Sequence, residues 1–152
     1  MRIVKSENSV HFRKAATAVE FSVVAIVFMT MLMGIFEFGR YFMVLQITKN
    51  AAREVARLAS VKTDGSITTA SLKQKAIDFM GPIVTNALSN GNPTISVEQV
   101  NLNGKKTDNW TNADYGEIIE VTISGNYKPI FNLFFKQIFK MEVSISIPSE
   151  GN

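Results

Sequence analysis

Glu20 is the residue best placed to do chemistry, because it is the single charged side chain in the apolar run from Ala15 to Phe36. A carboxylate in such a run costs several kcal/mol unless it is paired or protonated, which makes it a functional residue by default. The functional interpretation of Glu20 is a pairing site for a cation inside an apolar layer. The plainer alternative is a carboxylate that lies solvated at a membrane surface.

Few other residues suit catalysis or metal binding. His11 is the only histidine and there is no cysteine, so neither a Ser-His-Asp triad nor a zinc centre is expected after the apolar run. Oxygen-bearing side chains gather between Asp108 and Glu117, but their spacing matches no calcium loop. We expect a non-enzymatic protein with no metal and no cofactor. A membrane-tethered envelope enzyme that works with carboxylates alone is a remote alternative.

The element that positions Glu20 is the apolar run itself, which is long enough to cross a bilayer, since a spanning helix takes about 20 residues. The small residues of the run, Ala15 to Ala18, stand at its beginning rather than at its far end, so cleavage behind it as an ordinary secretory signal is not expected. A buried helix of a soluble protein is the alternative, and the rest of the chain is small for enclosing one. Basic residues precede the run and predict a cytoplasmic N-terminus with the following part exported: Arg2, Lys5, Arg13 and Lys14, against one acid, Glu7.

The net charge of +3 comes from this leader. The first fourteen residues hold four cations and one anion, and the remainder holds twelve of each. No basic surface with interleaved aromatic side chains is left over, so no nucleic-acid partner is expected.

The helix is predicted to continue beyond the membrane, because apolar residues recur near the helical period as far as Ala59 and no proline intervenes. A single helix over Ala15–Ala59 should be apolar in its first half and amphipathic in its second. The expected division of the chain is residues 1–15 as a basic cytoplasmic leader, 16–36 as the transmembrane helix, 37–60 as its extension, and 61–152 as an exported head.

The head is predicted to be α+β. A second helix is expected over Ser71–Leu88, kinked or divided at Gly81-Pro82. Alternating apolar and polar residues predict strands at 95–100, 119–123 and 141–147, which together make a roughly three-stranded antiparallel sheet. A turn at Thr63–Ser66, a polar loop at Asn101–Gly116 and a Phe-rich helix at Pro129–Lys140 complete the expectation. The rings of that last segment (Phe131, Phe134, Phe135, Phe139) are assigned to the core, with a membrane surface as the alternative.

Three segments of the first sixty residues together resemble the TadE-like pseudopilins: RKAATAVEF from Arg13, GIFEFGR from Gly34, and NAAREVAR from Asn50. The likeness covers residues 13–59, and the strand, Pro-Ile-Phe segment and final strand at the C-terminus resemble the family more loosely. Members are minor pilin-like subunits of the tight-adherence (Flp) pilus, a system related to type II and type IV secretion. The resemblance implies a single-pass protein of the bacterial inner membrane, with a pilin-like head in the periplasm or on the pilus.

The family pattern also implies roles for particular residues. A prepilin peptidase on the cytoplasmic face would cut between Ala15 and Ala16, within a junction formed by Arg13, Lys14, Ala15 and Ala16. Glu20 and Phe21 then become the fifth and sixth mature residues and serve subunit assembly. The membrane-exit motif is Glu37, Phe38, Gly39 and Arg40, in which Glu37 and Arg40 share a helix face and either pair with each other or snorkel separately.

Two positions depart from the family pattern. Ala15 stands where glycine is usual, and its Cβ fits a tight peptidase subsite less easily. Ile26 stands where many members carry proline, which predicts a straighter membrane helix. The expected function is pilus assembly, with the membrane, prepilin peptidase, other pilin and pseudopilin subunits and the Tad machinery as partners. The alternative is an uncleaved inner-membrane scaffold of the same system.

Overall fold

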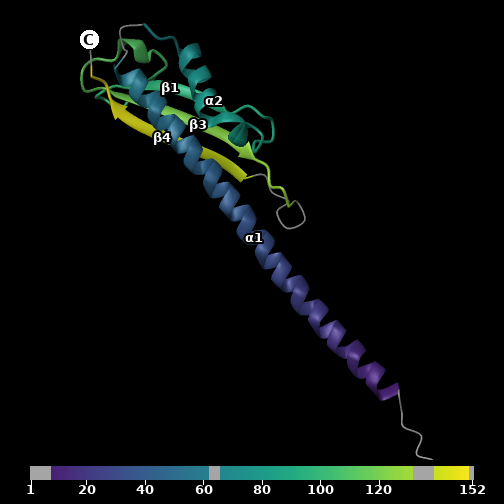
Figure 1. The fold of residues 1–152 in the computed structure, drawn as a ribbon. Coiled ribbons are helices and arrows are strands. Elements are labelled where there is room, and N and C mark those ends of the chain that lie inside the picture. The colour runs from purple at the N-terminus through teal and green to yellow at the C-terminus, as the bar shows by residue number, and fades with distance from the viewer. Residues whose placement is uncertain (1–7, 62–65, 132–138, 151–152) are drawn as a thin grey trace, which may run out of the picture. The chain divides into compact units, whose positions relative to one another are not determined.

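The chain contains two compact units, residues 1–38 and 39–152, which are considered separately below. The computed structural model describes residues 8–61, 66–131 and 139–150, and within residues 8–13 it describes the backbone alone. One helix, α1 (Asn8–Val61), supplies the first unit and the beginning of the second (Figure 1).

In the first unit α1 is an uninterrupted helix that begins seven residues before the predicted start at Ala15. It passes through Ile26 and Gly34 without a break, as expected where no proline removes a backbone hydrogen bond. Within the described part of the chain, α1 is the one helix long and apolar enough to cross a membrane, and none of its most apolar stretch is buried. The predicted membrane-length helix is therefore present, and its most apolar stretch is not part of the hydrophobic core of the chain.

The second unit is built on an antiparallel sheet, which confirms the predicted α+β class. Its strands are β1 (Thr94–Val100), β2 (Lys106–Thr107), β3 (Ile118–Tyr127) and β4 (Phe139–Pro148), in the order β2-β1-β3-β4. β3 is central and pairs with all seven residues of β1 and all ten of β4. The two-residue β2 is a fourth strand that the sequence did not reveal, because it lies in the polar loop and has no alternation to detect.

The second helix, α2 (Thr69–Thr85), begins where Thr68 accepts a hydrogen bond from the Ser71 amide at 3.2 Å. Gly81 interrupts it with φ 61° and ψ −175°, a conformation that suits glycine, and Pro82 follows. The predicted kink at Gly81-Pro82 is confirmed, although the helix ends three residues before the expected Leu88.

Both helices bury apolar side chains against one face of the sheet. The core face of α1 in this unit is made mostly of small residues. The sheet contributes the alternate side chains Ile119, Val121 and Ile123 from β3, all fully buried. Beside these lie, fully or almost fully buried, Val44, Ala51, Ala52, Val55, Ala56 and Ala59 from α1, and Leu72, Ala76, Met80 and Val84 from α2.

The predicted helix over Pro129–Lys140 is wrong at both ends. Residues 129–131 are not helical, and Phe139 and Lys140 are the first two residues of β4, opposite Tyr127 and Asn126 of β3. Pairing along the whole of β3 extends the alternation of β4 backwards and overrides the local helical pattern. Phe134 and Phe135 lie outside the described residues, as do Thr63, Asp64 and Gly65 of the predicted turn.

The face of the sheet away from the core carries a small polar cluster around Lys106 of β2. Its ammonium group forms an ion pair with Glu120 of β3 and lies 3.7 Å from a carboxylate oxygen of Glu98 on β1. Ser144 of β4 donates to Glu120 at 2.6 Å. The hydrogen bond from Lys106, followed by that from Ser144, lowers the pKa of Glu120 below its ordinary value of 4.5. The same pair raises the pKa of Lys106 above 10.5.

This cluster predicts a decline of head-domain stability at both extremes of pH. A carboxylate whose folded pKa is lowered stabilises the fold above about pH 4.5, and that contribution disappears as the pH falls through the folded pKa. A lysine whose folded pKa is raised stabilises the fold below about pH 10.5 and loses this as the pH rises further. Unfolding midpoints followed by Trp110 fluorescence should therefore fall less steeply below pH 4.5 in Lys106→Met than in the parent chain or in Lys105→Met. Equal acid slopes in all three proteins would contradict the assignment.

Candidate functional site

The predicted processing junction lies on the exposed surface of α1. Lys14, Ala15 and Ala16 are all exposed and helical. The side chain of Arg13 lies outside the described residues. The bond between Ala15 and Ala16 is therefore not covered by any described part of this chain.

Glu20 stands out from the other polar groups of the first unit because its carboxylate has no partner among the described residues. The hydroxyl groups nearby are satisfied within the helix: Ser22 donates to the Ala18 carbonyl at 2.7 Å, and Thr30 donates to the Ile26 carbonyl at 2.8 Å. Glu20 is exposed and has neither a hydrogen bond nor an ion pair to any other described residue. In an apolar layer, this carboxylate would have to find its cation on another chain.

The surface around Glu20 is apolar on all sides of the helix. Phe21, the predicted partner residue in assembly, is 72% exposed. A helix that is apolar all round and uncovered in its own chain is typical of a membrane segment or of a helix packed among other helices. The other large apolar side chains exposed in this unit are Val19, Val23, Val24, Ile26, Val27, Phe28, Met29, Met31, Met33, Ile35, Phe36 and Phe38.

The membrane-exit motif divides at the boundary between the two units. Glu37 is buried, Phe38 is exposed, and Gly39 is exposed with nothing within 4 Å of the position a Cβ would take. Gly34 is half-buried, and it too has nothing within 4 Å of the position a Cβ would take. Neither glycine is required by packing within the described part of the chain.

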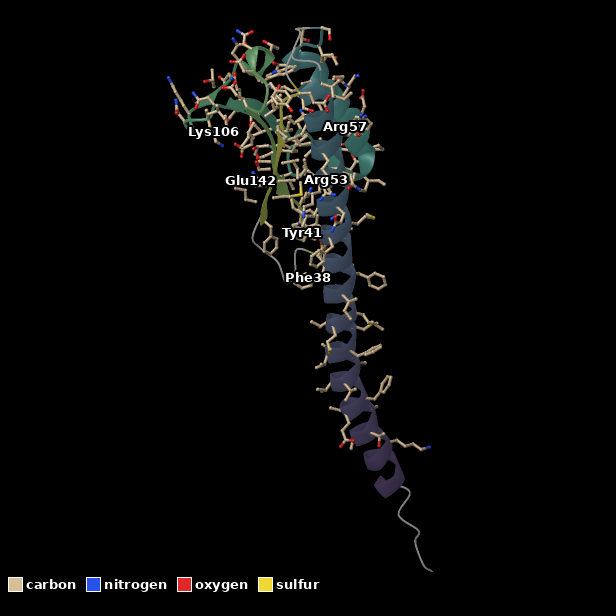
Figure 2. The ribbon with its side chains drawn as sticks, turned by 90° about the vertical axis from the view of Figure 1, so that its left-hand side faces the viewer. Phe38, Tyr41, Arg53, Arg57, Lys106 and Glu142 are labelled. Carbon is tan, nitrogen blue, oxygen red and sulfur yellow. The ribbon has the colours of Figure 1, made fainter. Side chains whose placement is uncertain are left out.

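Arg40, the last residue of that motif, is fixed to the sheet. Its Nη1 donates to the Tyr127 hydroxyl at 2.9 Å and to the Lys128 carbonyl at 3.1 Å. The guanidinium carbon lies 5.1 Å from the centre of the Tyr127 ring, within range of a cation–π contact. Tyr41, which Figure 2 labels on α1, packs edge-on against the same ring, with centroids 5.2 Å apart. The sequence did not reveal this anchor, because Tyr127 is 87 residues away and no local pattern connects it with Arg40.

The N-A-A-R-E segment of α1 has one buried and one exposed face. Ala51, Ala52, Val55 and Ala56 are buried in the core, whereas Arg53 and Arg57 are exposed. The spacing of the small residues therefore serves packing, and the charged residues are left for the surface.

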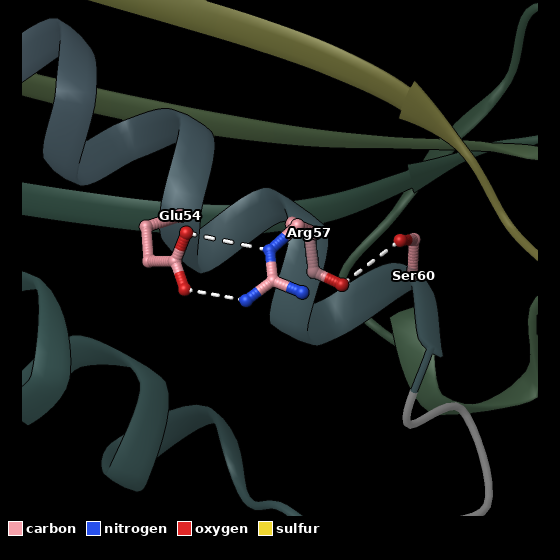
Figure 3. A network of polar contacts seen from close by, with 3 residues as sticks. All are labelled: Glu54, Arg57 and Ser60. Carbon is pink, nitrogen blue, oxygen red and sulfur yellow. Dashed lines mark hydrogen bonds and ion pairs between the residues drawn. The ribbon is translucent and has the colours of Figure 1, made fainter.

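Glu54 and Arg57 form a two-pronged ion pair on that exposed face (Figure 3). Arg57 Nη2 donates to Glu54 Oε1 at 2.7 Å and Nε donates to Oε2 at 3.3 Å. The Ser60 hydroxyl donates to the Arg57 carbonyl at 3.0 Å, one turn further on. The hydrogen bond from Arg57 lowers the pKa of Glu54, and the pKa of Arg57 is raised in return. By contrast, Arg53 has no ion pair within the described part of the chain.

Comparison with known protein families gives a match for one part of the chain. Residues 15–57 match the model of the TadE family, described as TadE-like protein. This match confirms the resemblance predicted from the sequence and spans Glu20, the membrane-exit motif and the N-A-A-R-E segment. No curated protein and no solved structure matches the chain significantly. The TadE match together with a membrane-length apolar helix is consistent with a pilin-like subunit of a Tad pilus.

Proposed function

We propose that this chain is a minor pilin-like subunit that takes part in assembly of a Flp/Tad-type adherence pilus, with no catalytic role of its own. The observation that carries the proposal is the unpartnered carboxylate of Glu20 on an uncovered apolar helix, inside the segment that matches the TadE family. The hydroxyl groups of Ser22 and Thr30 in the same apolar stretch donate to their own helix backbone. Glu20 is thus the group with a reason to contact another chain.

The cation for Glu20 is proposed to be the amino terminus of a neighbouring subunit. Cleavage between Ala15 and Ala16 by a prepilin peptidase would create an ammonium group four residues before Glu20, in the same apolar surroundings. Two such charges are each costly alone, and they offset each other when adjacent subunits are displaced along the helix axis. The pair would set the axial register of the subunits as they stack.

Loss of the leader has a second consequence. Residues 1–14 carry four cations and one anion, so their removal leaves a chain with no net charge. A basic flank holds a helix end at the cytoplasmic surface, and its removal would free the helix to leave the bilayer. The proposed topology is accordingly N-terminus inside, with residues 61–152 exported.

One observation favours a second candidate, an uncleaved scaffold of the same system anchored permanently in the inner membrane. Ala15 has a Cβ where the family junction has glycine, and this is the feature that would slow the peptidase. Topology, helix and head are the same in both cases. The processing state therefore distinguishes a subunit from a scaffold.

Replacing Ala15 by glycine tests the junction directly. If the peptidase cuts after residue 15, Ala15→Gly should speed conversion to the mature form, because the smaller residue fits the subsite better. The measurement is a pulse–chase of the full chain in cells that contain the cognate prepilin peptidase. Ala18→Gly, which makes the same change on the far side of the cut, serves as the matched control. Slower or unchanged conversion in Ala15→Gly would count against the junction as placed.

A further inference from the structure

The two edges of the sheet differ in how far they are protected from pairing with another strand. On one side β2 covers the end of β1, and Lys106 adds a charge there. On the other side β4 is the edge strand, and all ten of its residues pair with β3 without a bulge. No described residue pairs with the outer side of β4. A long, regular edge with free backbone groups is a template for another strand, and natural proteins usually protect it.

Residues that hinder the pairing of another strand with β4 are found only near its two ends. At the beginning of the strand Lys140 and Glu142 are exposed and form an ion pair at 2.6 Å. At its end stands Pro148, which cannot donate to a ladder. The stretch between them, Ser144 to Ile147, alternates small hydroxyl residues with isoleucines and carries no charge. This central stretch is chemically suited to pairing.

An open groove lies beside this stretch, between two polar contacts that α1 makes with the C-terminal part of the chain. At one end Thr48 of α1 contacts Met141, with its hydroxyl 3.9 Å from the sulfur. At the other end, just beyond β4, the Glu150 amide donates to the Ser60 carbonyl at 3.1 Å. Between these points the groove has a volume of 590 Å³. It is lined by Asn50, Arg53, Glu54 and Arg57 on α1 and by Ser144 to Ile147 on β4.

The groove has an apolar floor and a cationic wall. Ile145 and Ile147 pack on the core but are only half-buried, in contrast to Met141 and Val143 earlier in the same strand. On the wall, Glu54 neutralises Arg57, whereas Arg53 has no ion pair within the described residues. Figure 2 labels both arginines on α1. A segment that fills this groove should cover the two isoleucines with apolar side chains and place one carboxylate beside Arg53.

We propose that the β4 edge receives an extended strand from another protein subunit, in which apolar residues alternate with others and one carboxylate meets Arg53. Main-chain hydrogen bonds to β4 would supply affinity, and the Arg53 pair and the isoleucine floor would select the sequence. The inference rests on the proposed function only for the source of the strand, a neighbouring pilin or pseudopilin subunit.

A second copy of this chain fits the groove less well. Joining two β4 edges around a twofold axis makes one continuous sheet with both α1 helices on the same face. The two unbalanced Arg53 side chains would then approach each other across the joint, and like charges there oppose association. An acidic strand removes this conflict.

The test uses the full chain in neutral detergent micelles and two dye-labelled synthetic peptides. In both peptides valine and threonine alternate around one central residue, which is aspartate in the first and lysine in the second. Fluorescence anisotropy should show that the aspartate peptide binds about tenfold more tightly than the lysine peptide. Arg53→Glu should reverse this order, whereas Lys49→Glu, an exposed position on α1 outside the groove, should preserve it.

Edge variants separate strand addition from simple charge attraction. Ser146→Lys places a protecting charge on the open edge and should weaken both peptides about tenfold. Thr107→Lys makes the same kind of change on the opposite edge and should leave both affinities unchanged. If Arg53→Glu does not fold, Arg53→Gln should abolish the preference between the two peptides.

Three results would overturn the inference: no binding of either peptide, equal binding of both, or binding that Ser146→Lys does not weaken. Concentration-dependent dimers that Ser146→Lys abolishes would assign the edge to a second copy and overturn the acidic strand. Because purified chain and synthetic peptides are used, the outcome does not depend on pilus assembly. If the peptides do not bind, the proposed role of Glu20 in assembly is unaffected. If the Glu20 variants assemble normally, the peptide-binding result is likewise unaffected.

Discussion

Glu20→Ala is expected to leave membrane insertion intact and to abolish assembly of the subunit into the pilus system. Insertion should survive because the substitution makes the apolar run more apolar, and burying a methyl group in lipid carries no charge penalty. Assembly should fail because the amino terminus of the neighbouring subunit would keep its charge in an apolar layer without a partner. Removing one member of a buried ion pair costs about 3–5 kcal/mol, which corresponds to a loss of more than a hundredfold in pairing. The readouts are the membrane-fraction level of the chain and the amount of pilus material sheared from cells.

Two further variants sharpen this result. Glu20→Gln keeps the size and polarity of the side chain and removes its charge, so it should assemble as poorly as Glu20→Ala if the ion pair is what matters. Asp78→Ala removes an exposed acid from α2 that accepts a hydrogen bond from Gln74, and it should assemble normally. Normal piliation in both Glu20 variants would mean that the carboxylate is merely solvated at the membrane surface.

The second large effect is expected at Tyr127, which connects the Arg40 anchor to the core. Tyr127 is 1% exposed and holds Arg40 through its hydroxyl and its ring. Tyr127→Ala should lower the free energy of unfolding of the head by about 3–5 kcal/mol, as other large aromatic truncations in cores do. Tyr127→Phe keeps the ring and loses only the hydrogen bond, so it should cost about 1–3 kcal/mol.

Denaturant unfolding of the full chain in micelles, followed by fluorescence, measures these differences. The single tryptophan, Trp110, reports on the head because it is buried and its indole donates to Thr69 at 2.9 Å. Tyr115→Ala is the matched control, since Tyr115 is 83% exposed, and it should change stability by no more than about 0.5 kcal/mol. Equal losses in Tyr127→Ala and Tyr115→Ala would refute the anchor.

The spacing of apolar residues predicted helices and strands correctly wherever the local pattern and the tertiary packing favour the same structure. The apolar recurrence up to Ala59 predicted the second half of α1, and the alternation from Met141 to Ile147 predicted β4. The Gly81-Pro82 kink was predictable because both residues act through their own backbone. The helix predicted from the aromatic spacing was wrong at Phe139 and Lys140, because pairing with β3 makes these residues the beginning of β4.

The residues of the candidate site also differ in whether the sequence alone could predict them. Glu20 could be found from the sequence, because a lone charge in an apolar run is visible without any structure. The partner of Arg40 could not, since Tyr127 and Arg40 meet only when β3 packs against α1. The β4 groove could not be predicted either, because it is formed by residues of α1 and β4 that lie far apart in the sequence.

Whether the chain is processed as a pilin-like subunit is decided by the N-terminal residue of the protein recovered from cell membranes, with and without the cognate prepilin peptidase. We expect Ala16 at the N-terminus when the peptidase is present and Met1 when it is absent. Met1 in both strains would contradict processing and would turn the interpretation towards a permanent membrane scaffold.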